Sequence, residues 1–192
     1  GIPLTRDNVI IASGSAHAIG MVCETLLDPG DVVMVESPNF PGSMRTIRSF
    51  GATQVAIPMD EQGMRCDILE DELQKLADQG KRAKFIYCIP THQNPAGCTL
   101  QLDRREKLLE LARRFNTFVL EDDAYGELWF EQTPPPSVFA LSNGDHGIMK
   151  ALTWPAPLRG VAVLISLLVV APTATSSPTA PAAAMTSAST RA

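Results

Sequence analysis

The sequence predicts an α/β fold in which helices cover both faces of a mostly parallel β-sheet, giving three layers. Short apolar runs alternate with segments of helical periodicity, which is the pattern of repeated strand–helix units. Some of these runs, such as 32–35, are continuously apolar, as expected for strands that are buried on both faces. The chain of 192 residues is 45% hydrophobic and 6% aromatic with a net charge of -5, which indicates one domain with a sizeable core and gives no sign of a nucleic-acid-binding surface.

The first two strand–helix units occupy the first quarter of the chain. The apolar run 9–12 leads through a glycine-containing turn into a helix over 16–27, which ends where an Asp-Pro-Gly sequence breaks the helical pattern. The second unit has a buried-type strand over 32–35, a proline-containing loop and a helix over 43–50 closed by a glycine. Both units therefore predict a strand followed directly by a covering helix.

The same alternation continues to the middle of the chain. A short strand over 55–58 precedes an acidic helix whose leucines at 69, 73 and 76 share one face. A strand over 84–89 ends at a proline, and a helix over 103–115 turns its leucines inward and distributes its arginines around the surface. Another strand, beginning at Phe118, follows that helix.

Composition divides the chain into three parts. Residues 1–152 carry the alternating pattern and are predicted to form one partial domain. Residues 153–171 form a divergent apolar segment, which is either a buried strand or a segment foreign to the fold, and its apolar run is shorter than the roughly 20 residues of a membrane helix. Residues 172–192 are almost entirely Ala, Ser, Thr and Pro and are predicted to be a disordered tail.

The cysteines and the N-terminus give weaker indications. Cys23, Cys66, Cys88 and Cys98 have no metal-ligand spacing, so we predict reduced, structural cysteines and no metal site. The chain begins with neither a methionine nor a secretory signal. We therefore predict a cytoplasmic protein whose given sequence starts inside a longer chain.

Three consecutive acids close the strand that begins at Phe118. Glu121, Asp122 and Asp123 are followed closely by Tyr125. Adjacent carboxylates cannot all be desolvated cheaply, so a buried one needs a cationic partner. That partner is a candidate cofactor.

Four polar clusters follow predicted strands, at the edge where open parallel sheets bind ligands. The glycine turn at a helix start suits a phosphate, but it is also an ordinary serine cap. Phe40 offers a platform for a flat ring or simply packs, and Asn94 offers a donor and an acceptor or merely opens a turn. The acid and the tyrosine of the last cluster also have ordinary roles as a solvated strand end and a packed core residue. The clusters are Ser13-Gly14-Ser15, Pro38-Asn39-Phe40, Asn94-Pro95-Ala96-Gly97, and Asp122 with Tyr125.

Together these clusters are far more specific than any one of them. The chain resembles the large domain of fold-type I pyridoxal-phosphate enzymes, the class I/II aminotransferases. Within them it is most similar to the branch that contains 2-aminoadipate aminotransferases and the aminotransferase-like domains of MocR-type regulators. The phrases that carry the resemblance, in family order, are Ser13-Gly14-Ser15-Ala16, Leu27-Asp28-Pro29-Gly30-Asp31, Glu36-Ser37-Pro38-Asn39-Phe40-Pro41-Gly42, Gln93-Asn94-Pro95-Ala96-Gly97 and Glu121-Asp122-Asp123-Ala124-Tyr125-Gly126-Glu127-Leu128.

The resemblance implies pyridoxal 5′-phosphate as the cofactor. Gly14 and Ser15, with Ser13 beside them, would hold its phosphate, and Phe40 would stack on its pyridine ring. The resemblance also implies a partial large domain of the pyridoxal-phosphate-dependent transferase fold.

The same resemblance assigns the polar atoms of the ring. Asn94 and Tyr125 would bond the O3′ oxygen. Asp122 would pair with the protonated ring nitrogen, which lets the ring act as an electron sink, whereas Glu121 and Asp123 would be structural. Cis peptide bonds are implied at Ser37-Pro38 and Asn94-Pro95.

The chain departs from the family at the lysine that forms an imine with the cofactor. The family carries it in a Ser-x-x-Lys-like phrase after the aspartate, but residues 151–160 contain no lysine. Lys150 is the nearest candidate, and because it falls in a predicted strand we do not expect it to form the imine. Arg159 is a candidate remnant of a phosphate-binding arginine. A frameshift, a mis-spliced exon or a truncated gene from about Leu152 would explain the missing lysine and the tail.

The resemblance implies transfer of an amino group between an amino acid and a 2-oxo acid by a family homodimer, with neither a nucleic acid nor a membrane as partner. Without the lysine, we expect this chain to bind the cofactor at most non-covalently and to have negligible turnover. Another fold-type I activity remains open, namely a carbon–sulfur lyase, a decarboxylase or an aminocyclopropane-carboxylate synthase. So does the effector-sensing domain of a MocR-type transcription regulator, which would need a winged-helix segment upstream.

Overall fold

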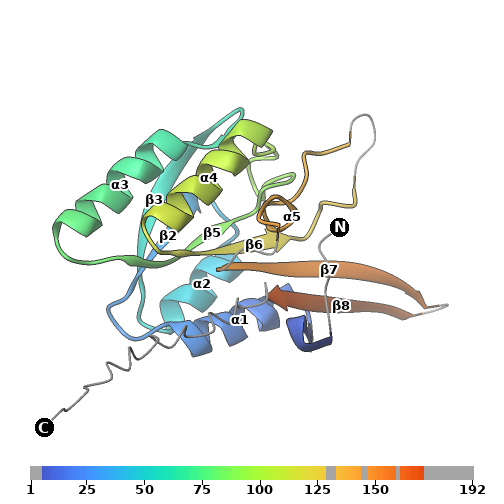
Figure 1. The fold of residues 1–192 in the computed structure, drawn as a ribbon. Helices are drawn as coiled ribbons and strands as arrows, with labels where there is room; N and C mark the ends of the chain where they lie inside the picture. The colour runs from blue at the N-terminus through green and yellow to red at the C-terminus, as the bar shows by residue number, and fades with distance from the viewer. Residues whose placement is uncertain (1–5, 129–132, 144–146, 159–160, 171–192) are drawn as a thin grey trace, which may run out of the picture.

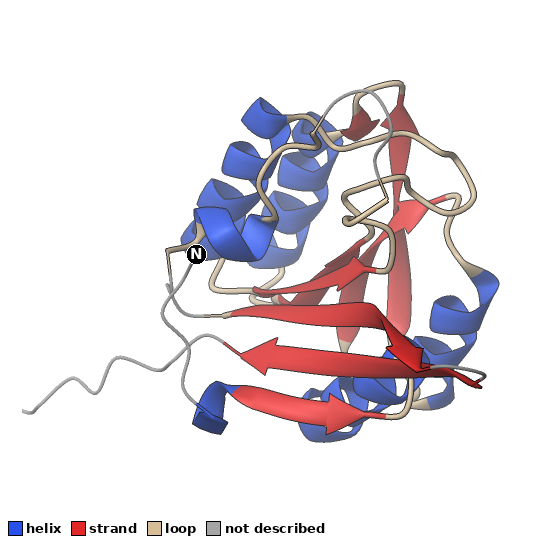
Figure 2. Ribbon diagram, turned by 90° about the vertical axis from the view of Figure 1, so that its right-hand side faces the viewer, coloured by secondary structure: helices blue, strands red, loops and turns tan. Residues whose placement is uncertain are grey.

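A computed structural model describes residues 6–128, 133–143, 147–158 and 161–170, and describes only the backbone of 152–158 and 161–170. In this part of the chain eight strands form one sheet with helices on both faces (Figures 1 and 2). The strands are β1 (Val9–Ala12), β2 (Val32–Ser37), β3 (Thr53–Asp60), β4 (Gly63–Met64), β5 (Ala83–Cys88), β6 (Phe118–Asp123), β7 (Ile148–Leu158) and β8 (Val161–Val170). The helices are a 3₁₀ turn (Arg6–Asn8), α1 (Ser15–Leu26), α2 (Pro41–Ser49), α3 (Cys66–Asp78), α4 (Leu102–Arg114) and α5 (Val138–Leu141).

The strand order is β1-β8-β7-β6-β5-β2-β3-β4. The pairs among β2, β3, β5, β6 and β7 are parallel, whereas β8 runs antiparallel to both β1 and β7, and β4 forms a short hairpin with β3. The prediction of a mostly parallel sheet between two helix layers is therefore confirmed. The apolar segment after residue 153 contains a strand, β8, which joins β1 to the rest of the sheet.

Two hydrophobic clusters cover the two faces of the sheet. One contains Val119 and Ile148 with residues of α3, α4 and α5, and the other contains Leu120 and Ala151 with residues of α1 and α2. Because side chains alternate along a strand, the next residues of β6 also alternate between these faces. Asp122 therefore lies on the face of the sheet that α1 and α2 cover. Glu121 and Lys150, its register partner in β7, lie on the face that α3, α4 and α5 cover.

The predicted elements are confirmed with small shifts at their ends. The second helix begins at Pro41 rather than at residue 43, because a proline is well tolerated in the first turn of a helix. Three elements were not predicted, namely the 3₁₀ turn, β4 and α5, since each is too short to show a period. The helix α5 begins at a Ser137 cap, whose hydroxyl accepts a hydrogen bond from the Ala140 N–H. The predicted tail, 172–192, lies outside the described residues, and the division of the chain into three parts stays a prediction.

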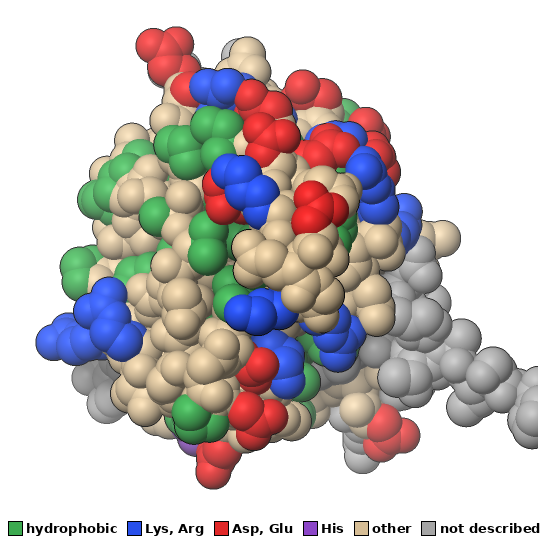
Figure 3. Space-filling view, turned by 90° about the vertical axis from the view of Figure 1, so that its left-hand side faces the viewer, with side chains coloured by type: hydrophobic (Ala, Val, Ile, Leu, Met, Phe, Trp, Pro, Cys, Tyr) green, Lys and Arg blue, Asp and Glu red, His purple; other side chains and the backbone are tan. Residues whose placement is uncertain are grey.

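The surface and the cysteines agree with this architecture. On the face drawn in Figure 3, acidic and basic side chains are interspersed rather than gathered into one patch. All four cysteines are free, as predicted. None of the helices in the described part of the chain has the length and apolar character needed to cross a bilayer.

Candidate functional site

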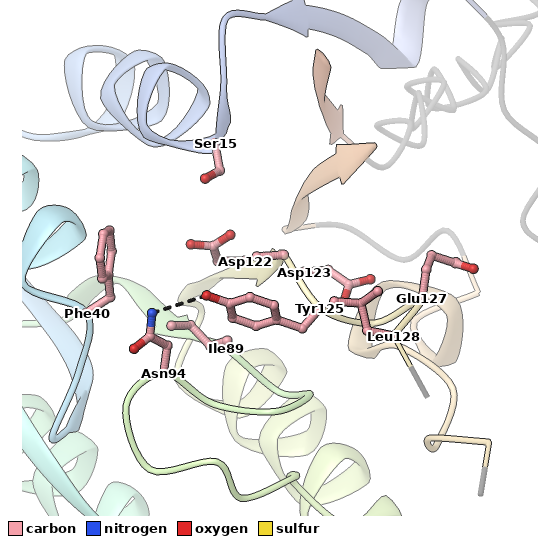
Figure 4. A pocket seen from close by; sticks show the side chains of 10 residues that line it. Ser15, Phe40, Ile89, Asn94, Asp122, Asp123, Tyr125, Glu127 and Leu128 are labelled. Carbon is pink, nitrogen blue, oxygen red and sulfur yellow. Dashed lines mark hydrogen bonds between the residues drawn. The ribbon is translucent and has the colours of Figure 1, made fainter. Parts of the chain in front are cut away.

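A cavity of about 440 Å³ lies beyond the carboxyl ends of the parallel strands (Figure 4). Ser15 reaches it from the start of α1, Phe40 from the residue before α2, and Asn94 from the loop after β5. Asp122 and Tyr125 enter it from the end of β6. Members of all four predicted clusters therefore meet in one cavity, because successive parallel strands end at the same edge of the sheet.

The start of α1 has the features of an anion site. Its N-cap is Gly14, with φ 84°, a backbone region that glycine adopts without steric cost, and no side chain caps the helix. The first N–H groups of α1 are thus left for a ligand, and the helix dipole favours a negative charge there. The Ser15 hydroxyl points into the cavity in Figure 4. Ser13 does not line the cavity, and its N–H donates to His17 Nδ1 at 3.1 Å.

Asn94 and Tyr125 form a hydrogen-bonded pair inside the cavity. The Asn94 Nδ2 group donates to the Tyr125 hydroxyl oxygen at 3.1 Å (Figure 4). The peptide bonds Ser37-Pro38 and Asn94-Pro95 are both cis, as predicted. Across the cavity, the ring of Phe40 is 42% exposed although it is large and apolar, so it offers an uncovered face to a flat ligand.

Asp122 has an unpaired buried oxygen. Its side chain is 4% exposed, and Oδ2 accepts a hydrogen bond from the Tyr87 hydroxyl at 2.7 Å. Oδ1 is buried without a partner, which is costly for a carboxylate. Burial raises the pKa of Asp122 to about 6. The Tyr87 hydrogen bond lowers this pKa, and the negative charge of Asp123 raises it further. A cationic N–H donor in the cavity would remove this cost.

The two neighbouring acids are bound by protein groups, although Asp123 Oδ1, like Asp122 Oδ1, is buried without a hydrogen-bond partner. Glu121 is fully buried, and its carboxylate accepts the N–H groups of Val138 and Phe139 at 3.1 and 2.9 Å, at the start of α5. Asp123 Oδ2 lies 2.6 Å from Lys150 Nζ. The expected need for a cationic partner is therefore met at Asp123 by Lys150, and at Glu121 by backbone donors, while Asp122 is left with neither.

No lysine reaches the cavity. The chain contains five lysines, and the structure describes all of them: Lys75, Lys81, Lys84, Lys107 and Lys150. None lines the cavity. Lys150 is paired in register with Glu121, so its side chain lies on the face of the sheet opposite Asp122. Arg159 lies outside the described residues.

A buried link that sequence reasoning missed connects the two cis-proline loops. Gln93 Nε2 donates to the carbonyl oxygen of Pro38 at 2.9 Å and to Glu36 Oε2 at 3.3 Å. The same Glu36 oxygen accepts the Ile89 N–H at 3.0 Å. Burial raises the pKa of Glu36 to about 8. An acid directly after a continuous apolar strand was the only sequence signal for this link.

A buried arginine on α4 fastens the loops around the site. Arg105 is 1% exposed and makes five hydrogen bonds, and guanidinium has five N–H donors. The acceptors are the carbonyls of Pro90, Leu100 and the prolines at 135–136, and the hydroxyl of Thr91. The arginine therefore joins the loop that carries Asn94 to the segment that leads into α5.

These features fit pyridoxal 5′-phosphate. The uncapped helix start matches a phosphate, the exposed Phe40 ring matches a pyridine ring, and the unpaired oxygen of Asp122 matches a protonated ring nitrogen. The described residues contain no cluster of side chains suited to a metal ion.

Comparison with known proteins agrees with the geometry. The model of the family described as aminotransferase class I and II matches residues 1–153. Aromatic-amino-acid aminotransferase 1 of Thermococcus litoralis is 38% identical over 133 residues, covering 69% of this chain and 32% of that protein. The 2-aminoadipate transaminase of Thermus thermophilus is 35% identical over 142 residues, covering 74% and 34%. The crystal structure of kynurenine aminotransferase from Pyrococcus horikoshii, in complex with PMP, has a TM-score of 0.79 and 37% identity, covering 88% of this chain and 42% of that one.

The chain belongs to the aminotransferase class I and II family. The resemblance drawn from the sequence phrases is thereby confirmed, and so is the pyridoxal-phosphate-dependent transferase-like fold. The chain spans about a third of the length of the curated relatives it matches.

Proposed function

We propose that this chain binds pyridoxal 5′-phosphate in the cavity at the end of β6. We also propose that it is part of a protein that transfers an amino group between an amino acid and a 2-oxo acid. The observation that carries the proposal is the buried, unpartnered Oδ1 of Asp122 in a cavity that also holds the Asn94–Tyr125 pair. The relatives named aminotransferases, and a structural neighbour solved with PMP, support it.

Each cavity residue has a role under this proposal. The N–H groups at Gly14 and Ser15 bind the phosphate, with Ser13 supporting the turn, and Phe40 covers one face of the ring. Bound cofactor supplies an electron sink for negative charge at the substrate carbon.

The polar residues of the cavity keep the ring in its reactive state. Asp122 holds the ring nitrogen protonated, because an ionised carboxylate stabilises a neighbouring cation. Asn94 and Tyr125, which are hydrogen-bonded to each other, would donate to the ring oxygen. The expectation of a homodimer rests on the family resemblance, and both it and the cytoplasmic location stay predictions.

Because no lysine reaches the cavity, we propose that this chain holds the cofactor without a covalent bond and has negligible turnover. A lysine amine in this position would serve both as the tether and as the base that moves a proton at the substrate carbon. The only lysine near the site, Lys150, is engaged by Asp123 on the other face of the sheet.

Replacing Asp122 by asparagine is expected to weaken cofactor binding by about 10-fold or more, since a hydrogen bond to a charged group is worth roughly 1.5–3 kcal/mol. Equilibrium dialysis of the full chain against pyridoxal phosphate, read by the absorbance of the cofactor, measures this. The matched control is Glu127→Gln, which removes an exposed acid at the rim of the same cavity. Equal affinity of the native chain and Asp122→Asn would refute the assignment.

Borohydride reduction in the presence of pyridoxal phosphate is expected to leave every lysine of the native chain unmodified by the cofactor. Peptide mass mapping after reduction reads out all five lysines at once. Lys150→Met is expected to lower stability, because Asp123 loses its cation. Efficient trapping at Lys150 would show that the side chain leaves its ion pair and serves as the tether.

A further inference from the structure

A buried chain of hydroxyl groups ends on Asp122. The Tyr87 hydroxyl lies 2.7 Å from Asp122 Oδ2 and 2.8 Å from the Ser43 hydroxyl oxygen. All three side chains are buried. A tyrosine has a single hydroxyl proton, so the arrangement that satisfies the carboxylate has Ser43 donating to Tyr87 and Tyr87 donating to Asp122.

The fold fixes this chain of hydroxyls from three elements. Tyr87 of β5 is paired in register with Leu120, so Tyr87 and Asp122 lie on the same face of the sheet. Ser43 lies in the first turn of α2, which covers that face. Because strands β5 and β6 are neighbours and α2 packs over them, the three groups are held by packed backbone elements rather than by loops.

The hydroxyl chain has an electrostatic consequence at Asp122. The titratable groups that face it are Asp123 on the same strand, Glu36 on β2 and Tyr87. The two acids oppose a negative charge on Asp122, and the Tyr87 hydrogen bond favours it. Burial raises the pKa of Tyr87 well above its ordinary value, so Tyr87 keeps its proton and stays a donor.

We propose that Tyr87 is a positioning residue that holds Asp122 ionised and turns its free oxygen, Oδ1, into the cavity, with Ser43 fixing the Tyr87 hydroxyl. With Oδ2 engaged by Tyr87, Oδ1 is the oxygen left for a cationic N–H group of a ligand. The role toward the cofactor rests on the proposed function, whereas the coupling of Tyr87 to Asp122 is a property of the protein without any ligand.

The coupling can be measured without cofactor because the chain has two tyrosines. The full chain is labelled with ¹³C at the tyrosine ring carbon that bears the hydroxyl, and Tyr125→Phe assigns the two resonances. The Tyr87 resonance is expected to move with a midpoint near pH 6, the pKa of Asp122, and to lose this midpoint in Asp122→Asn. If the Tyr87 resonance of the native protein does not move between pH 4 and 8, about two units either side of the midpoint, the proposal is overturned.

Two variants test the positioning role. Tyr87→Phe removes the hydroxyl, and we expect the Asp122 midpoint, followed by its own carboxyl ¹³C signal, to rise by about one pH unit. The ionised fraction of Asp122 then falls, so affinity for pyridoxal phosphate is expected to fall by about 2-fold at pH 7 and by about 10-fold near pH 5. Ser43→Ala is expected to raise the Asp122 midpoint and to lower the affinity for pyridoxal phosphate, each by a smaller amount. It also serves as the test if Tyr87→Phe does not fold.

The outcomes separate this inference from the proposed function. If the Tyr87 resonance titrates but the protein binds no pyridoxal phosphate, the coupling of Tyr87 to Asp122 is upheld and the proposed cofactor is rejected. Native binding of pyridoxal phosphate with unchanged affinity and unchanged Asp122 midpoint in both variants would reject the role of Tyr87 and leave the cofactor in place. Lower affinity without any change in midpoint would mean that Tyr87 acts only on packing, and would also overturn the proposal.

Discussion

Arg105→Met is expected to lower the free energy of unfolding by about 3–5 kcal/mol, the range seen when one partner of a buried polar network is removed. The guanidinium is buried and makes five hydrogen bonds. Methionine fills much of its volume but donates nothing. The buried Leu100 carbonyl would then lose its donor, at a cost of roughly 1–3 kcal/mol, and the segment at 135–136 would lose its link to α4, while the Pro90 carbonyl keeps the Leu100 N–H.

Urea unfolding of the full chain measures this loss. Arg105→Lys keeps the charge but has three donors in place of five, so an intermediate loss is expected. Arg114→Met is the matched control on the same helix, because Arg114 is about half exposed and pairs with Glu70 at the surface. That control should cost about 1 kcal/mol or less. A cost at Arg105 no larger than at Arg114 would show that the loops are held by other contacts.

Much of the fold follows from local sequence pattern. Strand and helix positions were predictable because apolar runs and helical periodicity are properties of neighbouring residues. That Asn94, Asp122 and Tyr125 meet at one cavity was predictable because each lies at or just after the end of a strand, and the carboxyl ends of parallel strands share one edge. The roles that the family phrases imply for them stay predictions.

The supporting contacts were not predictable, because they depend on which strands are neighbours. Tyr87 is 35 residues from Asp122 and 44 from Ser43, and Glu36 is 53 residues from Ile89. Nothing in the local pattern marks Tyr87 as more than a strand residue. Its role depends on β5 lying next to β6 in the sheet.

The three adjacent acids show how alternation along a strand divides a cluster. The sequence indicated that a buried acid needs a cation, but not which of the three had one. In the sheet, Glu121 and Asp122 point to opposite faces, and the lysine pairs with Asp123. Asp122 and Asp123 both line the cavity and both have a buried oxygen without a partner, but Asp123 has Lys150 beside its other oxygen, whereas Asp122 has only the Tyr87 hydroxyl.

Glu36→Gln is expected to remove a pH dependence of stability worth about 5 kcal/mol in the native chain. Burial raises the pKa of Glu36 to about 8 from an ordinary value of 4.5. Between these two pH values the folded chain binds a proton that the unfolded chain has released. The stability that Glu36 contributes is thus complete below about pH 4.5, falls as the pH rises, and is lost once the pH passes about 8.

Glutamine copies the protonated form of Glu36, since its amide oxygen can still accept from Ile89 and Gln93. The difference in unfolding free energy between native and Glu36→Gln should therefore be small near pH 5 and grow in favour of the variant up to about pH 8. Acids that do not interact with Glu36 titrate alike in both chains and cancel in the difference. Glu24→Gln, an exposed acid on α1, should show no such trend. A difference that stays constant from pH 5 to 8 would mean that Glu36 is ionised throughout this range. The Glu36 carboxylate would then be held as an anion by the Ile89 N–H and the Gln93 amide.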